Sequence, residues 1–259
     1  MPVSELSVKF SGKAPVHAER LTQLGQFRIS NAIARPNLPD LFYITELGPG
    51  LFAGELHEIY LEVGDATKIA LRQQAATRVL RNPLPNVASM RTEVIVGSQS
   101  SLEMLAQPII CFQGSRLLSE VEFELTEDSD LTFTEVVGVR VGLDAEISLS
   151  NTFRTKNGLI FVDRLEVSQN PLYGLDETWR EVMGGSGSYG ALYHFSKNSA
   201  HHKALIRLAT STSNSDMEHF NLYAVSPRED FTILRAHAAH AEALVELFED
   251  AAAALQTVR

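Results

Sequence analysis

Cysteine, basic charge and long apolar segments are the features that this sequence has least of. Its one cysteine, Cys111, excludes an internal disulfide and a zinc ribbon. Lys and Arg number 22 against 32 Asp and Glu, and the formal charge of −10 disfavours binding to nucleic acid or to an anionic membrane surface. No apolar run approaches the ~20 residues that span a membrane, and the first ten residues lack the apolar core of a signal peptide. We therefore expect a cytoplasmic protein that binds neither nucleic acid nor membranes.

The composition is otherwise that of a globular protein, and its dominant pattern is that of β-strands. Hydrophobic residues make up 44% of the 259 positions, which is enough apolar material for a core. From about residue 42 to 167, apolar and polar residues alternate in short runs, as in strands with one buried face. Asn157-Gly158 predicts a hairpin turn between the last two runs. The predicted strands cover 42–47, 59–63, 68–71, 93–96, 121–125, 131–137, 146–153 and 159–167.

A weak internal repeat runs through this β region. Val63, Val96 and Leu125 each end a strand, and each is followed by a polar turn and two inward positions two residues apart. A unit that cannot bury its own face predicts stacked strand–turn–strand layers, as in a β-solenoid or a wrapped sandwich. A plain antiparallel meander recurs at similar intervals and is the alternative. The inward pairs are Ile69/Leu71, Leu102/Met104 and Leu131/Phe133.

Helical spacing joins the strand pattern beyond residue 190. A strand at 191–195 precedes Lys197-Asn198-Ser199, which are good N-cap residues and predict a helix, and a second apolar stripe predicts a closing helix over 239–257. Two further strands are expected at 220–225 and 231–234. The prediction is one mainly β domain with two helices (α+β): an N-terminal strand or arm (1–26), a β-rich core (27–195) and a helix-strand-strand-helix part (196–259).

Common catalytic motifs do not occur in the sequence. It contains no phosphate-binding loop, no nucleophile elbow and no zinc-protease helix, so we expect no catalytic residue. Cys111 lies in an apolar run and is predicted to be a buried, inert thiol. His194 and the pair His201-His202 could supply imidazoles to nickel or zinc, and exposed or capping histidines are the alternative.

Three carboxylates stand just after predicted turns. Glu55 follows the glycine-rich segment 48–54, where a close approach of two backbones is expected. Glu103 and Glu135 occupy related places in two repeat units, so stacked layers could align them along a polar path through the interior. Solvated strand faces are the alternative for all three. For Glu55 we consider two interior roles, an ion pair with Arg78 and a metal ligand.

Four segments in order carry a family resemblance. Residues 48–55 read Gly-Pro-Gly-Leu-Phe-Ala-Gly-Glu, 72–81 contain Ala-Thr-Arg-Val-Leu-Arg, 105–116 contain Gln-Pro-Ile-Ile-Cys-Phe-Gln-Gly-Ser-Arg, and 158–165 end in Asp-Arg-Leu. This order resembles the UreD (UreH) family of urease accessory proteins, with its motifs GGL-x-x-GD, TT-x-x-ATK-x-YR, LPQP-x-I-x-F-x-GAR and [DE]RL. The resemblance extends from about Phe27 to the end, and its third motif is the most specific. The matching positions are Gly48, Gly50, Gly54, Glu55, Ala76, Thr77, Arg78, Arg81, Gln107, Pro108, Phe112, Gly114 and Arg116.

One family motif is altered in this chain. Where the family has GR-x-A-x-GE, residues 138–144 are shortened and lack its glutamate. Asp144 and Glu146 are the nearest acids that could replace it.

The resemblance implies a β-solenoid-like fold and a role without catalysis. It implies a scaffold that binds apo-urease and, through the accessory F protein, the nickel-carrying GTPase accessory G protein. It also implies no tightly bound cofactor, with nickel in transit through an internal polar channel, which requires weak oxygen and imidazole ligands. A diverged β-rich binding module without a nickel role, or a β-fold hydrolase using these histidines with an acid, are the alternatives. The candidates for metal transit are Glu55, Thr77, Glu103, Glu135, Asp144, His194, His201 and His202.

Overall fold

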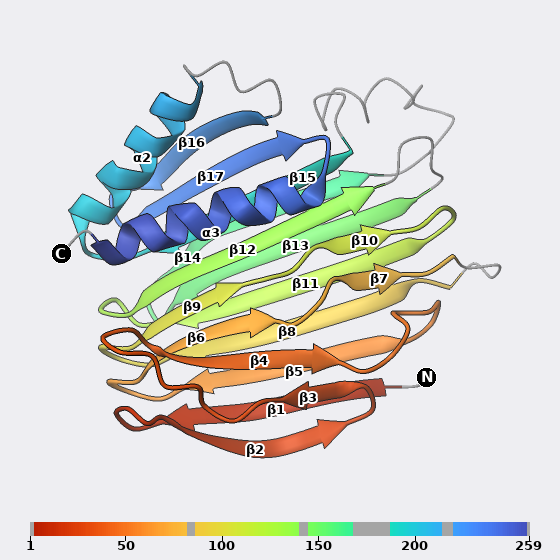
Figure 1. Ribbon diagram of the computed structural model, residues 1–259, viewed down its shortest axis with the longest axis horizontal. Coiled ribbons are helices and arrows are strands. Elements are labelled where there is room, and N and C mark those ends of the chain that lie inside the picture. The colour runs from red at the N-terminus through yellow and green to blue at the C-terminus, as the bar shows by residue number, and fades with distance from the viewer. Residues whose placement is uncertain (1–2, 82–85, 140–144, 168–186, 214–219, 258–259) are drawn as a thin grey trace.

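Two β-sheets packed face to face, with two helices on the outer side of one of them, form the molecule in a computed structural model (Figure 1). The structure describes residues 3–81, 86–139, 145–167, 187–213 and 220–257. Sheet 1 has seven strands in the order β14-β13-β11-β8-β5-β1-β2. These strands are β1 (Val3–Ser11), β2 (His17–Leu24), β5 (Leu56–Val63), β8 (Ala88–Val96), β11 (Arg116–Leu125), β13 (Glu146–Thr155) and β14 (Gly158–Val167).

Sheet 2 has ten strands and carries both helices. Its main path runs β16-β17-β15-β12-β9-β6-β4-β3, and β10 pairs with β12 and with β7. The strands are β3 (Phe27–Ile29), β4 (Asp40–Glu46), β6 (Lys68–Gln73), β7 (Thr77–Val79), β9 (Ser101–Leu105), β10 (Ile109–Cys111), β12 (Asp130–Val139), β15 (Ser188–Phe195), β16 (Phe220–Arg228) and β17 (Phe231–Ala238). The helices are α2 (Ser199–Ser213) and α3 (Ala241–Thr257). Neither helix is long and apolar enough to cross a membrane.

The central strands form the stacked layers that the repeat predicts. The chain passes from sheet 2 to sheet 1 in each layer, and strands of successive layers pair in parallel, β5-β8-β11-β13 in one sheet and β4-β6-β9-β12 in the other. Val96 lies opposite both Val63 and Leu125. The inward pairs Ile69/Leu71, Leu102/Met104 and Leu131/Phe133 also align in register. The predicted fold class is therefore confirmed, and the plain antiparallel meander is wrong.

Antiparallel hairpins flank the parallel layers. The turn predicted at Asn157-Gly158 is confirmed, since Thr155 pairs with Gly158 and the glycine has a φ of 131°. At the other end β1 pairs in parallel with β5 and in antiparallel fashion with β2. The alternation of apolar residues does not predict β2, β3, β7 and β10, because β2 is mostly exposed and the other three strands span only three residues each.

The main core lies between the sheets and is rich in aromatic rings. Phe123 and Phe153 stack with centroids 5.1 Å apart, and Phe133 and Tyr193 pack beside them. A second cluster joins the outer face of sheet 2 to both helices. Full burial of a large apolar side chain stabilises a fold by about 1.5–3 kcal/mol. The members of this second cluster include Leu192, Leu205, Leu234, Leu244, Phe248, Ala251 and Leu255.

Candidate functional site

A group of polar side chains is buried between the two sheets at the last layer, and we call it the Glu135 cluster. Sheet 2 supplies Glu135, Tyr193 and Arg235, and sheet 1 supplies Asn151 and Asp163. Glu135 takes an inward position of β12 after the apolar Leu131 and Phe133, because side chains two residues apart face the same side of a strand. Asn151 does the same on β13 between Leu149 and Phe153.

Hydrogen bonds connect the Glu135 cluster into one chain. Asn151 Nδ2 donates to Glu135 Oε2 at 2.7 Å and lies 3.2 Å from the Tyr193 hydroxyl. That hydroxyl donates to Asp163 Oδ2 at 2.8 Å, and Arg235 Nη2 pairs with the same oxygen at 2.6 Å. The side chain of Arg235 is 25% exposed, whereas Glu135 is 5% exposed. This series of hydrogen bonds therefore leads from the partly exposed ion pair of Arg235 and Asp163 to the enclosed carboxylate of Glu135.

Glu135 has the chemistry of a group that exchanges a proton near neutral pH. The pKa of Glu135 is raised to about 7, because burial raises it strongly, the Asn151 hydrogen bond offsets part of this effect, and the nearby charge of Asp163 adds to it. Asn151 Oδ1 is buried and has no hydrogen-bond partner within the described part of the chain. A carboxylate and a free amide oxygen can hold a hard or borderline cation, and hold it weakly.

Buried polar residues continue from this cluster across sheet 1. Each of β5, β8, β11 and β13 places one on its inward face: His57, Thr92, Ser119 and Asn151. The four residues zigzag from strand to strand. His57 and Ser119 lie at one level of the register, and Thr92 and Asn151 lie two residues further along the strands, a step of roughly 7 Å. We call these four residues the polar row.

His57 begins the polar row as a neutral imidazole. Burial lowers the pKa of His57 to about 4, and its ring packs edge-on against Phe27. Neither ring nitrogen has a hydrogen-bond partner in the described residues. His57 and Asn151 were not predicted as site residues, although a polar residue at an inward position of an alternating strand is a signal in the sequence.

A second carboxylate, that of the partly buried Glu46, lies near the first layer. Glu46 Oε2 accepts a hydrogen bond from Thr77 Oγ1 at 3.0 Å, and Glu46 Oε1 is buried with no partner among the described residues. Burial raises the pKa of Glu46, and the nearby charge of Glu55 acts in the same direction. Thr77 and Glu55 were among the residues predicted from the sequence, whereas Glu46 was not.

The glycine-rich turn has the close backbone approach that we expected. Gly50 has a φ of 135°, and a Cβ atom there would lie 2.3 Å from the carbonyl oxygen of Arg78. Glu55 is not turned toward the interior, because its Oε2 accepts a hydrogen bond from the Phe52 amide at 2.9 Å on the exposed side of the turn. Of the two roles considered for Glu55, the ion pair with Arg78 is wrong, because Glu55 contacts the Phe52 amide instead, and the role of metal ligand stays a prediction. Thr77 and Val79 take the inward positions of β7, so the Arg78 side chain is exposed.

Glu103 lies on the outer face of sheet 2, so it does not align with Glu135. The register pairs Glu103 with Thr132, whereas the inward positions are Leu102 and Met104. Its Oε1 forms an ion pair with Arg72, and its Oε2 accepts a hydrogen bond from Gln256 Nε2 at 2.6 Å. The expectation of one shared axis is wrong for this pair of acids.

The three predicted histidines come together between sheet 2 and α2, with His194 on the outer face of β15 and His201 and His202 on the helix. The His194 ring lies 5.3 Å from that of His201 and 5.4 Å from that of His202, measured between centroids. His202 uses Nδ1 with Thr232 Oγ1 at 2.9 Å and Nε2 with the Ser196 carbonyl at 2.7 Å, which identifies it as a structural anchor. Burial and the two neighbouring rings lower the pKa of His194 to about 3. No three metal-ligating side chains among the described residues could together hold an ion.

The remaining motif positions build one corner of the layers. β7 and β10, from the second and third motif segments, pair in parallel, and the Thr77 amide donates to the Pro108 carbonyl at 3.0 Å. The prediction that Cys111 is buried is confirmed, and burial raises its pKa to about 12, which disfavours the reactive thiolate. Asp144 lies outside the described residues. The other motif positions, Gly48, Gly54, Ala76, Arg81, Gln107, Phe112, Gly114 and Arg116, lie in or beside the same turns and short strands.

Comparisons with known proteins agree with the resemblance seen in the motifs. A family model described as UreD urease accessory protein matches residues 4–259. The chain is similar to urease accessory protein UreD of Staphylococcus epidermidis, with 24% identity over 57% of this chain and 53% of that protein. The protein of that name from Bacillus sp. strain TB-90 is 28% identical over 54% and 52%, and that of Actinobacillus pleuropneumoniae is 33% identical over 38% and 36%. The chain therefore spans about half or less of the length of these relatives.

Proposed function

Because the chain belongs to the UreD urease accessory protein family, we propose that it is a cytoplasmic, non-enzymatic scaffold for urease maturation. In this role it binds apo-urease together with the accessory F and G proteins and passes nickel toward the urease active site. The observation that carries the nickel role is the polar row that leads to the enclosed carboxylate of Glu135.

Transit requires ligands that bind and release. The polar row offers isolated donors, an imidazole at His57, hydroxyls at Thr92 and Ser119, and an amide oxygen at Asn151. Isolated oxygen and nitrogen donors hold nickel weakly, whereas a closed set of thiolates or imidazoles would retain it. This donor set suits a passage and not a storage site.

Glu135 gives the passage a step that depends on protonation. With a pKa of about 7, this carboxyl group can lose its proton when a cation arrives and regain it when the cation leaves. A carboxylate with an ordinary pKa would stay charged in the interior after release, at a larger cost in free energy. The raised pKa of Glu135 therefore favours repeated cycles of cation binding and release at this carboxyl group.

The Glu135→Gln substitution tests this role. Glutamine keeps the shape of the side chain and an oxygen for the Asn151 hydrogen bond but removes the charge. We expect co-purification with urease and the accessory proteins to remain, while the nickel content of urease and its activity fall about tenfold, the effect of ~1.4 kcal/mol in ligand affinity.

A matched control is Glu124→Gln on the exposed face of β11, which should activate urease like the wild type. Full nickel loading by a stably folded Glu135→Gln protein would remove the nickel role and leave only the scaffold role. Loss of co-purification in both variants would contradict the scaffold role.

A further inference from the structure

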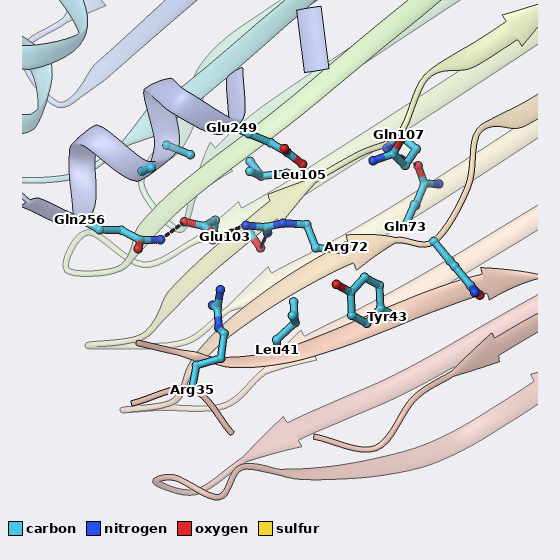
Figure 2. Close-up of a pocket in the computed structure, with 13 residues that line it drawn as sticks. Arg35, Leu41, Tyr43, Arg72, Gln73, Glu103, Leu105, Gln107, Glu249 and Gln256 are labelled. Carbon is cyan, nitrogen blue, oxygen red and sulfur yellow. Dashed lines mark hydrogen bonds and ion pairs between the residues drawn. The ribbon is translucent and has the colours of Figure 1, made fainter. Parts of the chain in front are cut away.

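A trench of about 440 Å³ lies on the outer face of sheet 2, separate from the Glu135 cluster (Figure 2). Strands β4, β6 and β9 supply one wall and α3 supplies the other. The small side chains of Ala252 and Ala253 line the helix wall and leave the trench open. Two guanidinium groups, those of Arg35 and Arg72, reach into it.

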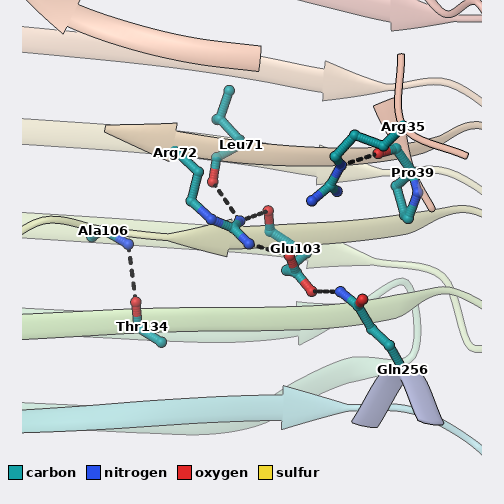
Figure 3. A network of polar contacts seen from close by, with 8 residues as sticks. All are labelled: Arg35, Pro39, Leu71, Arg72, Glu103, Ala106, Thr134 and Gln256. Carbon is teal, nitrogen blue, oxygen red and sulfur yellow. Dashed lines mark hydrogen bonds and ion pairs between the residues drawn. The ribbon is translucent and has the colours of Figure 1, made fainter. Parts of the chain in front are cut away.

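Arg72 is fully engaged with the protein. It pairs with Glu103, and its Nη1 donates to the Leu71 carbonyl at 3.1 Å (Figure 3). The second oxygen of Glu103 accepts the hydrogen bond from Gln256 of α3. The charge of Arg72 is therefore neutralised, and this contact fixes the floor of the trench to its helix wall.

Arg35 is not engaged in this way. Its Nε donates to the Pro39 carbonyl at 2.9 Å, but its Nη2 is buried and has no hydrogen-bond partner within the described residues. No described carboxylate lies within ion-pair distance of it, and Figure 2 shows its guanidinium pointing toward the interior of the trench. The guanidinium of Arg35 therefore lines the trench without a neutralising carboxylate, and an anionic ligand in the trench would supply one.

We propose that this trench binds the carboxylate of a ligand through Arg35. The planar fork of a guanidinium matches the two oxygens of a carboxylate. Gln73 and Gln74 use their side-chain oxygens within the protein, with the Gln107 amide and with Thr45, which leaves their NH₂ groups as further donors at the trench wall. This inference stands whether or not the chain passes nickel.

The charge around the trench selects against more highly charged anions. Glu249 is exposed at the trench, and the chain carries a formal charge of −10. Both disfavour a phosphate dianion more than a single carboxylate. Two sources share the carboxylate chemistry: a small free carboxylic acid, or an acidic side chain of a polypeptide.

Calorimetric titration of the full-length protein tests the proposal with four probes. These are glutarate, the peptide acetyl-Gly-Ser-Glu-Ser-Gly-amide, the same peptide with Gln for Glu, and inorganic phosphate. We expect saturable binding of glutarate or of the acidic peptide, and weaker binding of phosphate. Peptide binding that is tighter than glutarate binding and is lost with the Gln peptide identifies a polypeptide source, and the reverse order identifies a small acid.

Matched variants assign the binding to the trench. Arg35→Gln should weaken it about tenfold or more, the effect of a lost hydrogen bond to a charged group, while Arg91→Gln on sheet 1 should leave it unchanged. Ala253→Trp should block the trench, while Ala254→Trp, an exposed neighbour outside it, should not. Three results overturn the proposal: no saturation by either carboxylate at tens of millimolar, wild-type affinity in a folded Arg35→Gln protein, or phosphate as the tightest ligand.

Discussion

Glu103 and Glu135 lie on the neighbouring strands β9 and β12 and are both buried, but they lie on opposite faces of sheet 2 and have different partners. On the outer face, Glu103 is neutralised by Arg72 and linked to α3 through Gln256. On the inner face, the carboxylate of Glu135 is bonded to the amide of Asn151, and burial raises its pKa to about 7. The same residue type thus serves as a structural ion pair on one face and as a proton-exchanging group on the other.

The largest expected effect comes from removing the cation on the outer face. Arg72→Leu would leave Glu103 buried without its ion-pair partner, and both side chains are at most 16% exposed. We expect the free energy of unfolding to fall by about 3–5 kcal/mol, measured by urea denaturation. The double variant Arg72→Leu/Glu103→Leu should recover most of this loss, and a double variant as unstable as the single one would contradict the ion-pair explanation.

A smaller effect, with the opposite sign, is expected on the inner face. The pKa of Glu135 is raised from 4.5 to about 7, so the unfolded chain loses this proton at lower pH than the folded protein does. Stability from this group is therefore full below pH 4.5, declines as the pH rises to 7, and stays reduced above it, by ~3 kcal/mol in all.

Urea denaturation of Glu135→Gln at pH 5 and pH 8 measures this effect. Because glutamine does not titrate, the variant should gain stability relative to the wild type at pH 8, and the gain should shrink at pH 5. A gain that is independent of pH would show that Glu135 titrates with an ordinary pKa in the folded protein.

The smallest effect is expected at a solvated ion pair. Glu122 and Arg154 lie 3.2 Å apart on the outer face of sheet 1, and their side chains are 53% and 48% exposed. Glu122→Gln should change stability by less than about 1 kcal/mol, and high salt should remove the difference. A larger loss would show that exposure to solvent does not weaken this ion pair relative to the buried pair of Arg72 and Glu103.

The layered fold could be predicted because its signal is local and repeated. The positions Val63, Val96 and Leu125 stack in register, as the alternation of apolar residues indicates. The same alternation separates the two carboxylates, since Glu103 lies between the inward Leu102 and Met104, whereas Glu135 continues the inward series of Leu131 and Phe133. Treating both acids as inward was therefore an avoidable error.

The partners of Glu135 could not be predicted in the same way. Asp163, Tyr193 and Arg235 come from β14, β15 and β17, and only the packing of the two sheets brings them together. Arg35 is a similar case, because it lies in the segment before β4 and reaches the trench through tertiary contacts. Pattern and spacing describe one strand at a time, so contacts across the sandwich lie beyond them.

The hairpins at the two ends of sheet 1 have a consequence for self-association. A sheet edge presents open backbone groups that a strand of a second molecule could extend. The edge strands here are β2 and β14, and each joins the parallel stack through an antiparallel pairing with a register shift, at Ser7/Val8 and at Phe153/Arg154, which distorts the edge. The edge strands also expose charged side chains, Glu19 and Arg20 on β2 and Arg164 and Glu166 on β14. The irregular pairing and the charges at both edges of sheet 1 therefore oppose growth into a fibre.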